Sequence, residues 1–188
     1  MEANELLVNK LIEKNYKIAT AESCTGGLLA AKIVDVANAS KVFDMSFVTY
    51  SNESKRELLG VSETLINSFG VVSEEVALKM AYGVSVKSKA EVGVGISGIA
   101  GPTGATENKP IGMVCFGFYI NGMSYSVTKY FGDIGRNNVR NLSVAFVLDF
   151  LNSVLYFLHT EISDVVPLRV TLLVGYPRIG IHVALTIP

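Results

Sequence analysis

The segment Thr20-Ala21-Glu22-Ser23-Cys24-Thr25-Gly26-Gly27 lies between a short apolar run, which predicts a strand, and a second apolar run, which predicts a helix. Backbone N–H groups at the start of a helix have no partners within the helix and carry partial positive charge. They stabilise an anion, or an oxygen that becomes negative during a reaction. We therefore predict that Ser23 is a nucleophile facing these groups, and that Gly26 and Gly27 let the main chain approach a ligand. The alternative is that Ser23 only caps the helix, since serine is a favoured N-cap residue.

Strands and helices are predicted to alternate along the rest of the chain, from the spacing of apolar residues and the position of turn residues. The predicted helices cover residues 5–14, 26–36, 52–59, 62–69, 73–88 and 136–159, and the predicted strands cover residues 17–21, 45–50, 92–96, 112–120 and 123–130. This alternation predicts an α/β domain with helices on both faces of a largely parallel sheet. Asn121-Gly122 predicts a hairpin, which would make the sheet mixed. Ligands of such sheets bind beyond the carboxyl ends of the strands.

The composition excludes several classes of function. The 188 residues include 16 basic and 17 acidic side chains without a basic cluster, which argues against binding to nucleic acid. The most apolar stretch, residues 142–158, is interrupted by Asp149 and therefore predicts a buried helix and no membrane span. Two cysteines, Cys24 and Cys115, cannot form a disulfide framework or a four-ligand zinc site, and neither a metal nor a cofactor is predicted. We expect a single domain in the cytoplasm, because the N-terminus lacks the pattern of a signal peptide.

A serine nucleophile needs a base, and residues 48–55 are the best place to look for one. His159 and His182 do not follow strands, so a Ser-His-Asp arrangement is not expected. Residues 48–55 leave the second strand, and Lys55 would accept the serine proton if burial and neighbouring positive charge lowered its pKa. Tyr50 would relay a proton or hold the leaving group. The alternatives are a solvated Lys55 on a helix surface and a Tyr50 in the core.

A second glycine-rich loop, residues 97–104, matches neither the Walker pattern nor the dinucleotide fingerprint, but its N–H groups would cradle a phosphate. The alternative is a plain connection between strands. Arg136 and Arg140 share one helix face and would either clamp a phosphate or lie at the surface. Cys24 is a rival nucleophile, because thiolates are favoured near helix N-termini, or else a small buried residue. The predicted substrate-binding residues are Thr25, Gly26, Gly27, Ser97, Gly98, Ala100, Gly101, Arg136 and Arg140.

The chain contains four ordered motifs: residues 20–27, residues 48–55, Gly-Val-Val-Ser-Glu-Glu-Val-Ala at residues 70–77 and Ile-Ser-Gly-Ile-Ala-Gly-Pro-Thr-Gly at residues 96–104. Together with Lys109-Pro110-Ile111-Gly112 and the two arginines, they resemble the CinA C-terminal domain family. The resemblance covers residues 4–158. Two departures, Ala105 in place of a glycine and an insertion at Ile134-Gly135, would alter the rim of the pocket.

The resemblance implies a three-layer α/β/α sandwich with a mixed, mostly parallel sheet over residues 1–159, in a stand-alone form of the domain and in a homo-oligomer. It implies hydrolysis of the carboxamide of nicotinamide mononucleotide to the nicotinate nucleotide and ammonia, a step of pyridine nucleotide salvage. Ser23 would be the nucleophile and Lys55 its base, with Tyr50 close by and no metal.

Two other hypotheses stay open. One is a mononucleotide-binding module without catalysis that serves a regulatory or competence-related partner, and the other is a thiol hydrolase that uses Cys24. Residues 160–188 lie beyond the resemblance. We expect them to form an extra hairpin, a subunit-exchange arm or a poorly ordered extension.

Overall fold

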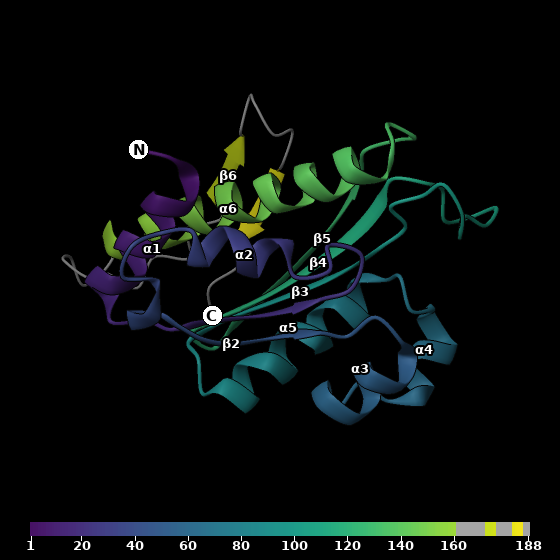
Figure 1. Ribbon diagram of the computed structural model, residues 1–188, viewed down its shortest axis with the longest axis horizontal. Coiled ribbons are helices and arrows are strands. Elements are labelled where there is room, and N and C mark those ends of the chain that lie inside the picture. Colours follow the sequence, from purple (N-terminus) through teal and green to yellow (C-terminus); the bar gives the residue numbers. More distant parts are fainter. Residues whose placement is uncertain (161–171, 176–181, 186–188) are drawn as a thin grey trace.

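The computed structural model describes residues 1–160, 172–175 and 182–185. Its elements follow one another in the order expected from the sequence (Figure 1). The helices are α1 (Ala3–Lys14), α2 (Leu28–Val34), α3 (Asn52–Leu59), α4 (Glu63–Phe69), α5 (Glu74–Ser88) and α6 (Arg136–Thr160), with a 3-10 turn, η1, at Ala39–Lys41. The strands of the main sheet are β1 (Ile18–Glu22), β2 (Phe43–Val48), β3 (Val92–Gly98), β4 (Met113–Ile120) and β5 (Met123–Tyr130).

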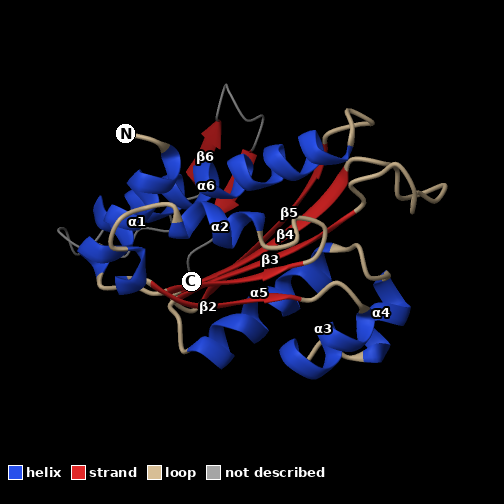
Figure 2. Ribbon diagram, viewed as in Figure 1, coloured by secondary structure: helices blue, strands red, loops and turns tan. Residues whose placement is uncertain are grey.

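Helices cover both faces of the main sheet, which gives three layers (Figure 2). The strand order is β2-β1-β3-β4-β5. β1 pairs in parallel with β2 and β3, whereas β4 runs antiparallel to β3 and β5. Helices α1, α2 and α6 lie on one face, and α3, α4 and α5 lie on the other. The prediction of an α/β/α sandwich with a mixed sheet is therefore confirmed.

Helix α6 contains the apolar stretch that the sequence analysis assigned to the interior. Phe146 and Phe150 of α6 pack against Phe116 and Phe118 of β4, with ring centroids 4.7 Å apart for Phe116–Phe146 and 4.1 Å apart for Phe118–Phe150. Across the described residues, no helix has the length and hydropathy needed to cross a membrane. The prediction of a buried helix is confirmed for the side that faces the sheet, whereas Leu142 and Tyr156 are exposed.

Two further strands, β6 (Leu172–Gly175) and β7 (His182–Leu185), pair antiparallel with each other. Of the three expectations for residues 160–188, this pairing fits the extra hairpin. The other residues beyond 160 lie outside the described residues, so the arm and the extension stay predictions.

Local sequence signals explain where several helices begin and end. Asn15 ends α1 in the left-handed conformation, with φ of 53°, and Gly60 ends α3 in the same conformation, with φ of 67°. Ser51, Ser62 and Ser73 precede α3, α4 and α5, and each side-chain oxygen accepts a hydrogen bond from the amide three residues later. These caps satisfy amides that have no partner within the helix, and they confirm the predicted boundaries of these three helices.

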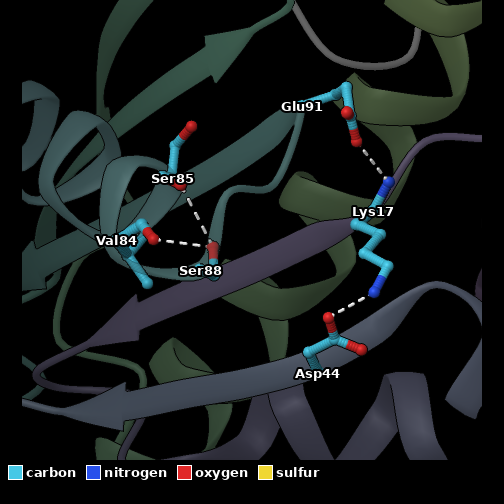
Figure 3. Close-up of polar contacts among 6 residues, drawn as sticks. All are labelled: Lys17, Asp44, Val84, Ser85, Ser88 and Glu91. Carbon is cyan, nitrogen blue, oxygen red and sulfur yellow. Dashed lines mark hydrogen bonds and ion pairs between the residues drawn. The ribbon is translucent and has the colours of Figure 1, made fainter.

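Polar contacts lie at the amino ends of the strands and, separately, at the end of α5 (Figure 3). Lys17 lies just before β1, although the predicted strand of residues 17–21 included it, and its ammonium contacts Asp44 of β2 at 2.5 Å. The amide of Lys17 donates to the carboxylate of Glu91, just before β3, at 2.8 Å. The hydroxyl of Ser88 donates to the carbonyl of Val84 in the last turn of α5. The predicted site residues lie at the opposite, carboxyl ends of the same strands.

Helix α5 packs very close to the sheet because the facing strand positions are glycines. A Cβ atom at Gly95 would lie 2.0 Å from the carbonyl oxygen of Ala77, and one at Gly117 would lie 2.3 Å from the same oxygen. A Cβ atom at Gly93 would lie 2.1 Å from the carbonyl oxygen of Ala81. These oxygens belong to the backbone of α5 and cannot rotate away, so an added methyl group would have to displace the helix.

Gly95→Ala is therefore expected to lower the free energy of unfolding by about 3 kcal/mol or more, at the upper end of the cost of overpacking a core. The midpoint of urea denaturation measures the effect. Gly122→Ala is the matched control, because no atom lies within 4 Å of its Cβ position and its φ of 91° is the only obstacle. The free energy of unfolding of that variant should fall by about 1 kcal/mol. Equal midpoints for the two variants would contradict the close packing of α5.

Candidate active site

Three segments that leave the carboxyl ends of β1, β2 and β3 meet around Ser23. The amide of Ser23 donates to the carbonyl of Ile96 in β3 at 3.0 Å, and the amide of Thr49 donates to the carbonyl of Glu22 in β1 at 2.9 Å. Ser23 is thereby fixed next to the segment that follows β2. Lys55 lies in α3 and reaches back, so that its Nζ lies 3.2 Å from Ser23 Oγ. The two residues are 32 positions apart in the sequence.

The amine of Lys55 is buried and held by a backbone oxygen. The residue is 1% exposed, and its Nζ also donates to the carbonyl of Thr49 at 2.7 Å. None of the three ion pairs found among the described residues includes Lys55. Burial lowers the pKa of Lys55 to about 8, because the charged form loses its hydration. The alternative of a solvated Lys55 is therefore wrong.

The geometry also orients the neutral form of this amine. A carbonyl oxygen can only accept hydrogen bonds, so an N–H of neutral Lys55 must point at Thr49. The nitrogen lone pair is then free to accept the hydroxyl proton of Ser23 at the observed separation of 3.2 Å. Lys55 and Ser23 thus have the arrangement expected of a base and a nucleophile.

The start of α2 is occupied by Glu22, which corrects one sequence-based expectation. Glu22 is 0% exposed, and its carboxylate accepts hydrogen bonds from the amides of Gly27, Leu29 and Ala30 at 2.9–3.1 Å. The N-cap residue is Gly27, so the interpretation of Ser23 as a helix cap is wrong. The expectation that the helix amides hold an oxyanion is also wrong, because a buried carboxylate already takes them.

Two amides closer to Ser23 have no backbone acceptor among the described residues. Cys24 and Thr25 lie in the turn between β1 and α2, and their N–H groups donate no backbone hydrogen bond to any described residue. The next amide, that of Gly26, is already bonded to the carbonyl of Ser23 at 3.1 Å. The amides of Cys24 and Thr25 are therefore the donors available to an oxygen that becomes negative beside Ser23.

A pocket of about 240 Å³ opens at this end of the sheet. Its lining comes from the segments after β1, β2 and β3, from the connection between α4 and α5, and from the start of α6. The lining residues are Ser23, Cys24, Tyr50, Asn52, Lys55, Val71, Val72, Ser97, Gly98, Ile99, Ala100, Thr103, Gly104 and Arg136. A concave site with a few converging polar groups is typical of a binding site for a small molecule.

The predicted site residues divide into two groups. Seven of them line the pocket: Ser23, Lys55, Tyr50, Ser97, Gly98, Ala100 and Arg136. The other predicted residues lie outside the lining: Thr25, Gly26, Gly27, Gly101 and Arg140. The predicted site residues did not include Asn52, Val71, Val72 or Thr103, although each of these belongs to one of the four motifs. Valine has no chemistry of its own, so only the fold reveals that these side chains form a wall.

Tyr50 and Arg136 form a bridge at the edge of the pocket. Tyr50 is 62% exposed, so the alternative of a core tyrosine is wrong. Arg136 donates to the hydroxyl of Tyr50 at 2.8 Å and to the carbonyl of Gly101 at 2.9 Å. The guanidinium therefore joins the segment after β2 to the loop after β3. Among the described residues, the hydroxyl of Tyr50 has this contact with Arg136 and none with Lys55 or Ser23.

Two side chains bind the backbone of the connection between α4 and α5, which forms one side of the pocket. The hydroxyl of Ser97 donates to the carbonyl of Val71 at 2.7 Å. The ammonium of Lys109 donates to the carbonyls of Phe69 and Val72 at 2.8 and 2.7 Å. Ser97 at the end of β3 and Lys109 between β3 and β4 thus bind the backbone on this side of the pocket.

Cys24 lines the pocket but lacks the electrostatic environment of a nucleophile. Its side chain is 5% exposed, and burial raises the pKa of its thiol to about 12. The thiol therefore stays protonated near neutral pH, and thiols react as thiolates. In the described part of the chain, no group of three or more histidine, cysteine, aspartate or glutamate side chains is placed to hold a metal ion.

The sequence pattern of the family described as CinA C-terminal domain matches residues 1–155. The chain belongs to the CinA C-terminal domain family. A CinA-like protein of Kosmotoga olearia is 47% identical over 151 residues, which are 80% of this chain and 36% of that protein. The chain thus spans about a third of the length of this curated relative.

Solved structures of the CinA superfamily share the fold. A superfamily protein from Klebsiella pneumoniae is 30% identical and has a TM-score of 0.79, with 82% of this chain and 96% of that chain covered. The competence/damage inducible protein CihA from Agrobacterium tumefaciens is 36% identical and has a TM-score of 0.70, with 85% and 95% covered. The resemblance inferred from the four motifs is thereby confirmed.

Proposed function

We propose that this CinA-family chain is an amidohydrolase that releases ammonia from the carboxamide of nicotinamide mononucleotide through an acyl-enzyme on Ser23. The observation that carries the proposal is the 3.2 Å contact between the buried amine of Lys55 and the hydroxyl of Ser23. The choice of substrate rests on the family resemblance. That resemblance further predicts a role in pyridine nucleotide salvage, a homo-oligomer and a cytoplasmic location.

In the first step, Ser23 Oγ attacks the amide carbon while Lys55 takes the hydroxyl proton. The C–N bond then breaks, and Lys55 returns the proton to the nitrogen, which leaves as ammonia. The amides of Cys24 and Thr25 donate to the oxyanion, and one well-placed donor contributes about 3 kcal/mol to such a step. Water then attacks the ester, with Lys55 again accepting a proton, and releases the nicotinate nucleotide and free Ser23.

The edge of the pocket offers donors for the phosphate. A guanidinium has five N–H donors, and the contacts of Arg136 with Tyr50 and Gly101 leave some of them unused. The backbone amides of Ala100 and Gly101 donate no backbone hydrogen bond to any described residue. These groups support a phosphate at the mouth of the pocket and the carboxamide beside Ser23. On this proposal, Tyr50 is released from Arg136 when the phosphate binds and then reaches the leaving nitrogen.

The proposal is tested by incubating the purified chain with nicotinamide mononucleotide and measuring both ammonia and nicotinate mononucleotide. Equal amounts of the two products are expected. Nicotinamide riboside, which lacks the phosphate, should react with a higher KM. Saturable binding of the mononucleotide without either product would instead support the non-catalytic module.

The reaction rate should depend on pH through Lys55. Its pKa of about 8 means that the amine is mostly protonated below this pH and cannot accept the serine proton. We expect kcat/KM to fall about tenfold for each pH unit below 8 and to level off above it. Initial rates of ammonia release between pH 5.5 and 9.5 would measure the profile. A profile that is flat between pH 6 and 9 would contradict the role of Lys55 as base.

A further inference from the structure

The turn that carries Ser23 is held from outside by an arginine of α6. Arg140 donates to the carbonyl of Thr25 through Nη2 at 2.8 Å and through Nε at 3.3 Å. The two residues are 115 positions apart in the sequence. The same carbonyl accepts the amide of Leu28 at 3.3 Å. Arg140 does not line the pocket, although Arg136, one helical turn earlier, does.

The guanidinium of Arg140 lies against the backbone of this turn. A Cβ atom built at Gly26 would lie 3.7 Å from its Nη2. On the inner side, the buried carboxylate of Glu22 binds the amides that follow Gly26. The turn is therefore held by an acid on its inner side and by a base on its outer side, each through charge-assisted hydrogen bonds to the backbone.

We propose that Arg140 is a positioning residue for the nucleophile and makes no contact with the substrate. This inference deepens the proposed function and rests on it. The contact with the Thr25 carbonyl fixes the orientation of the turn. That orientation sets the direction of the Ser23 hydroxyl relative to Lys55. It also aims the amides of Cys24 and Thr25 at the oxyanion.

The experiment uses an uncharged alkyl fluorophosphonate, which reacts with activated serines and carries neither nucleotide nor phosphate charge. Ser23 Oγ forms a bond to phosphorus, fluoride leaves, and Lys55 takes the hydroxyl proton. The rate of labelling therefore reports the nucleophile without substrate recognition. We expect Arg140→Met to slow labelling about 10- to 100-fold, the cost of a small misplacement of reacting groups. The kcat for ammonia release should fall similarly, with KM within about twofold of the wild-type value.

Two further variants are compared with Arg140→Met. Arg140→Lys keeps one charged donor for the Thr25 carbonyl and should recover part of the labelling rate. Arg56→Met is the matched control, because Arg56 has a surface ion pair with Glu63 at 3.1 Å and such pairs contribute little. It should label at the wild-type rate. Circular dichroism and thermal unfolding check that each variant is folded. If Arg140→Met does not fold, the labelling rate of Arg140→Lys is compared with that of the wild-type protein instead.

The outcomes separate this inference from the proposed function. A wild-type protein that is neither labelled nor able to release ammonia would overturn the proposed function and, with it, the role of Arg140. A wild-type protein that is labelled, together with an Arg140→Met protein labelled equally fast, would overturn the positioning role alone. A raised KM with unchanged kcat and labelling would also overturn it, because Arg140 would then contact the substrate.

Discussion

Ser23→Ala is expected to reduce ammonia release from nicotinamide mononucleotide by at least about 10⁴-fold, the scale seen when a serine nucleophile is removed. The physical reason is that alanine has no oxygen to form the acyl-enzyme, so the attack would require a water molecule in its place. The only hydrogen bond found for the hydroxyl of Ser23 among the described residues is the one with Lys55, so the fold should be unchanged. Initial rates with excess enzyme, together with circular dichroism, measure the two effects.

Two further variants serve as controls for this result. Ser88→Ala removes a hydroxyl from the last residue of α5 (Figure 3), which does not line the pocket, and should keep the wild-type rate. Cys24→Ala should keep most of the activity, because a thiol with a pKa of about 12 does not act as a thiolate at neutral pH. An active Ser23→Ala protein and an inactive Cys24→Ala protein would reverse the assignment in favour of the thiol hydrolase.

Lys55→Met is expected to change activity and stability in opposite directions. Ammonia release should fall about 10²- to 10⁴-fold, the usual contribution of a general base. The free energy of unfolding at pH 6 should rise by about 1–3 kcal/mol, because methionine fills the site without a charge to desolvate while the Thr49 carbonyl loses a donor. Urea denaturation of both proteins at pH 6 measures the gain in stability.

The sign of the stability effect follows from the pKa of Lys55. The folded-state pKa of about 8 lies below the ordinary value of 10.5. Between these values the unfolded chain binds more protons at this position than the folded chain, so the wild-type stability rises with pH there. The advantage of Lys55→Met should therefore be full below pH 8 and shrink between pH 8 and 10.5. Lys87→Met, at an exposed position of α5, should change neither activity nor stability. A loss of stability in Lys55→Met at pH 6 would contradict the burial of the charge.

A lysine acts as a base near neutral pH only if its surroundings lower the pKa of its amine. Thr49 contributes only a carbonyl, and no carboxylate forms an ion pair with Lys55 in the described residues. A carboxylate at this place would raise the pKa of the amine and keep it protonated. Glu22, the buried acid that directly precedes Ser23, is instead bound to the amides of α2. Its charge is thus satisfied by the backbone.

Much of the fold could be predicted because its signals are local. Serine caps, glycine stops and the Asn121-Gly122 turn act over three or four residues, and the structure places α3 and α5 where these signals predicted. The turn shows positive φ at both residues, 47° and 91°, as a two-residue hairpin requires. The alternation of strands and helices then allowed few arrangements of the sheet.

The candidate site could be predicted only in part. Ser23 and Lys55 follow neighbouring parallel strands, and that placement was enough to bring them together in the prediction. From the sequence we predict that Arg136 and Arg140 act together, because they share a helix face. In the fold they have different partners, the hydroxyl of Tyr50 and the carbonyl of Thr25. Spacing along a helix fixes a direction, but what lies in that direction depends on segments far away in the sequence.

The sequence by itself determined the order of the elements, the mixed sheet and the family, because caps, turns and short motifs depend on neighbouring residues. Only the tertiary structure decided that Lys55 is buried and that Glu22 occupies the start of α2. Desolvation of an amine depends on contacts between packed segments, and the hydrogen bonds of Glu22 to amides five to eight residues later depend on how the turn between β1 and α2 folds back on the strand. No pattern within residues 52–59 alone contains the contact of Lys55 with Ser23, which lies 32 positions earlier.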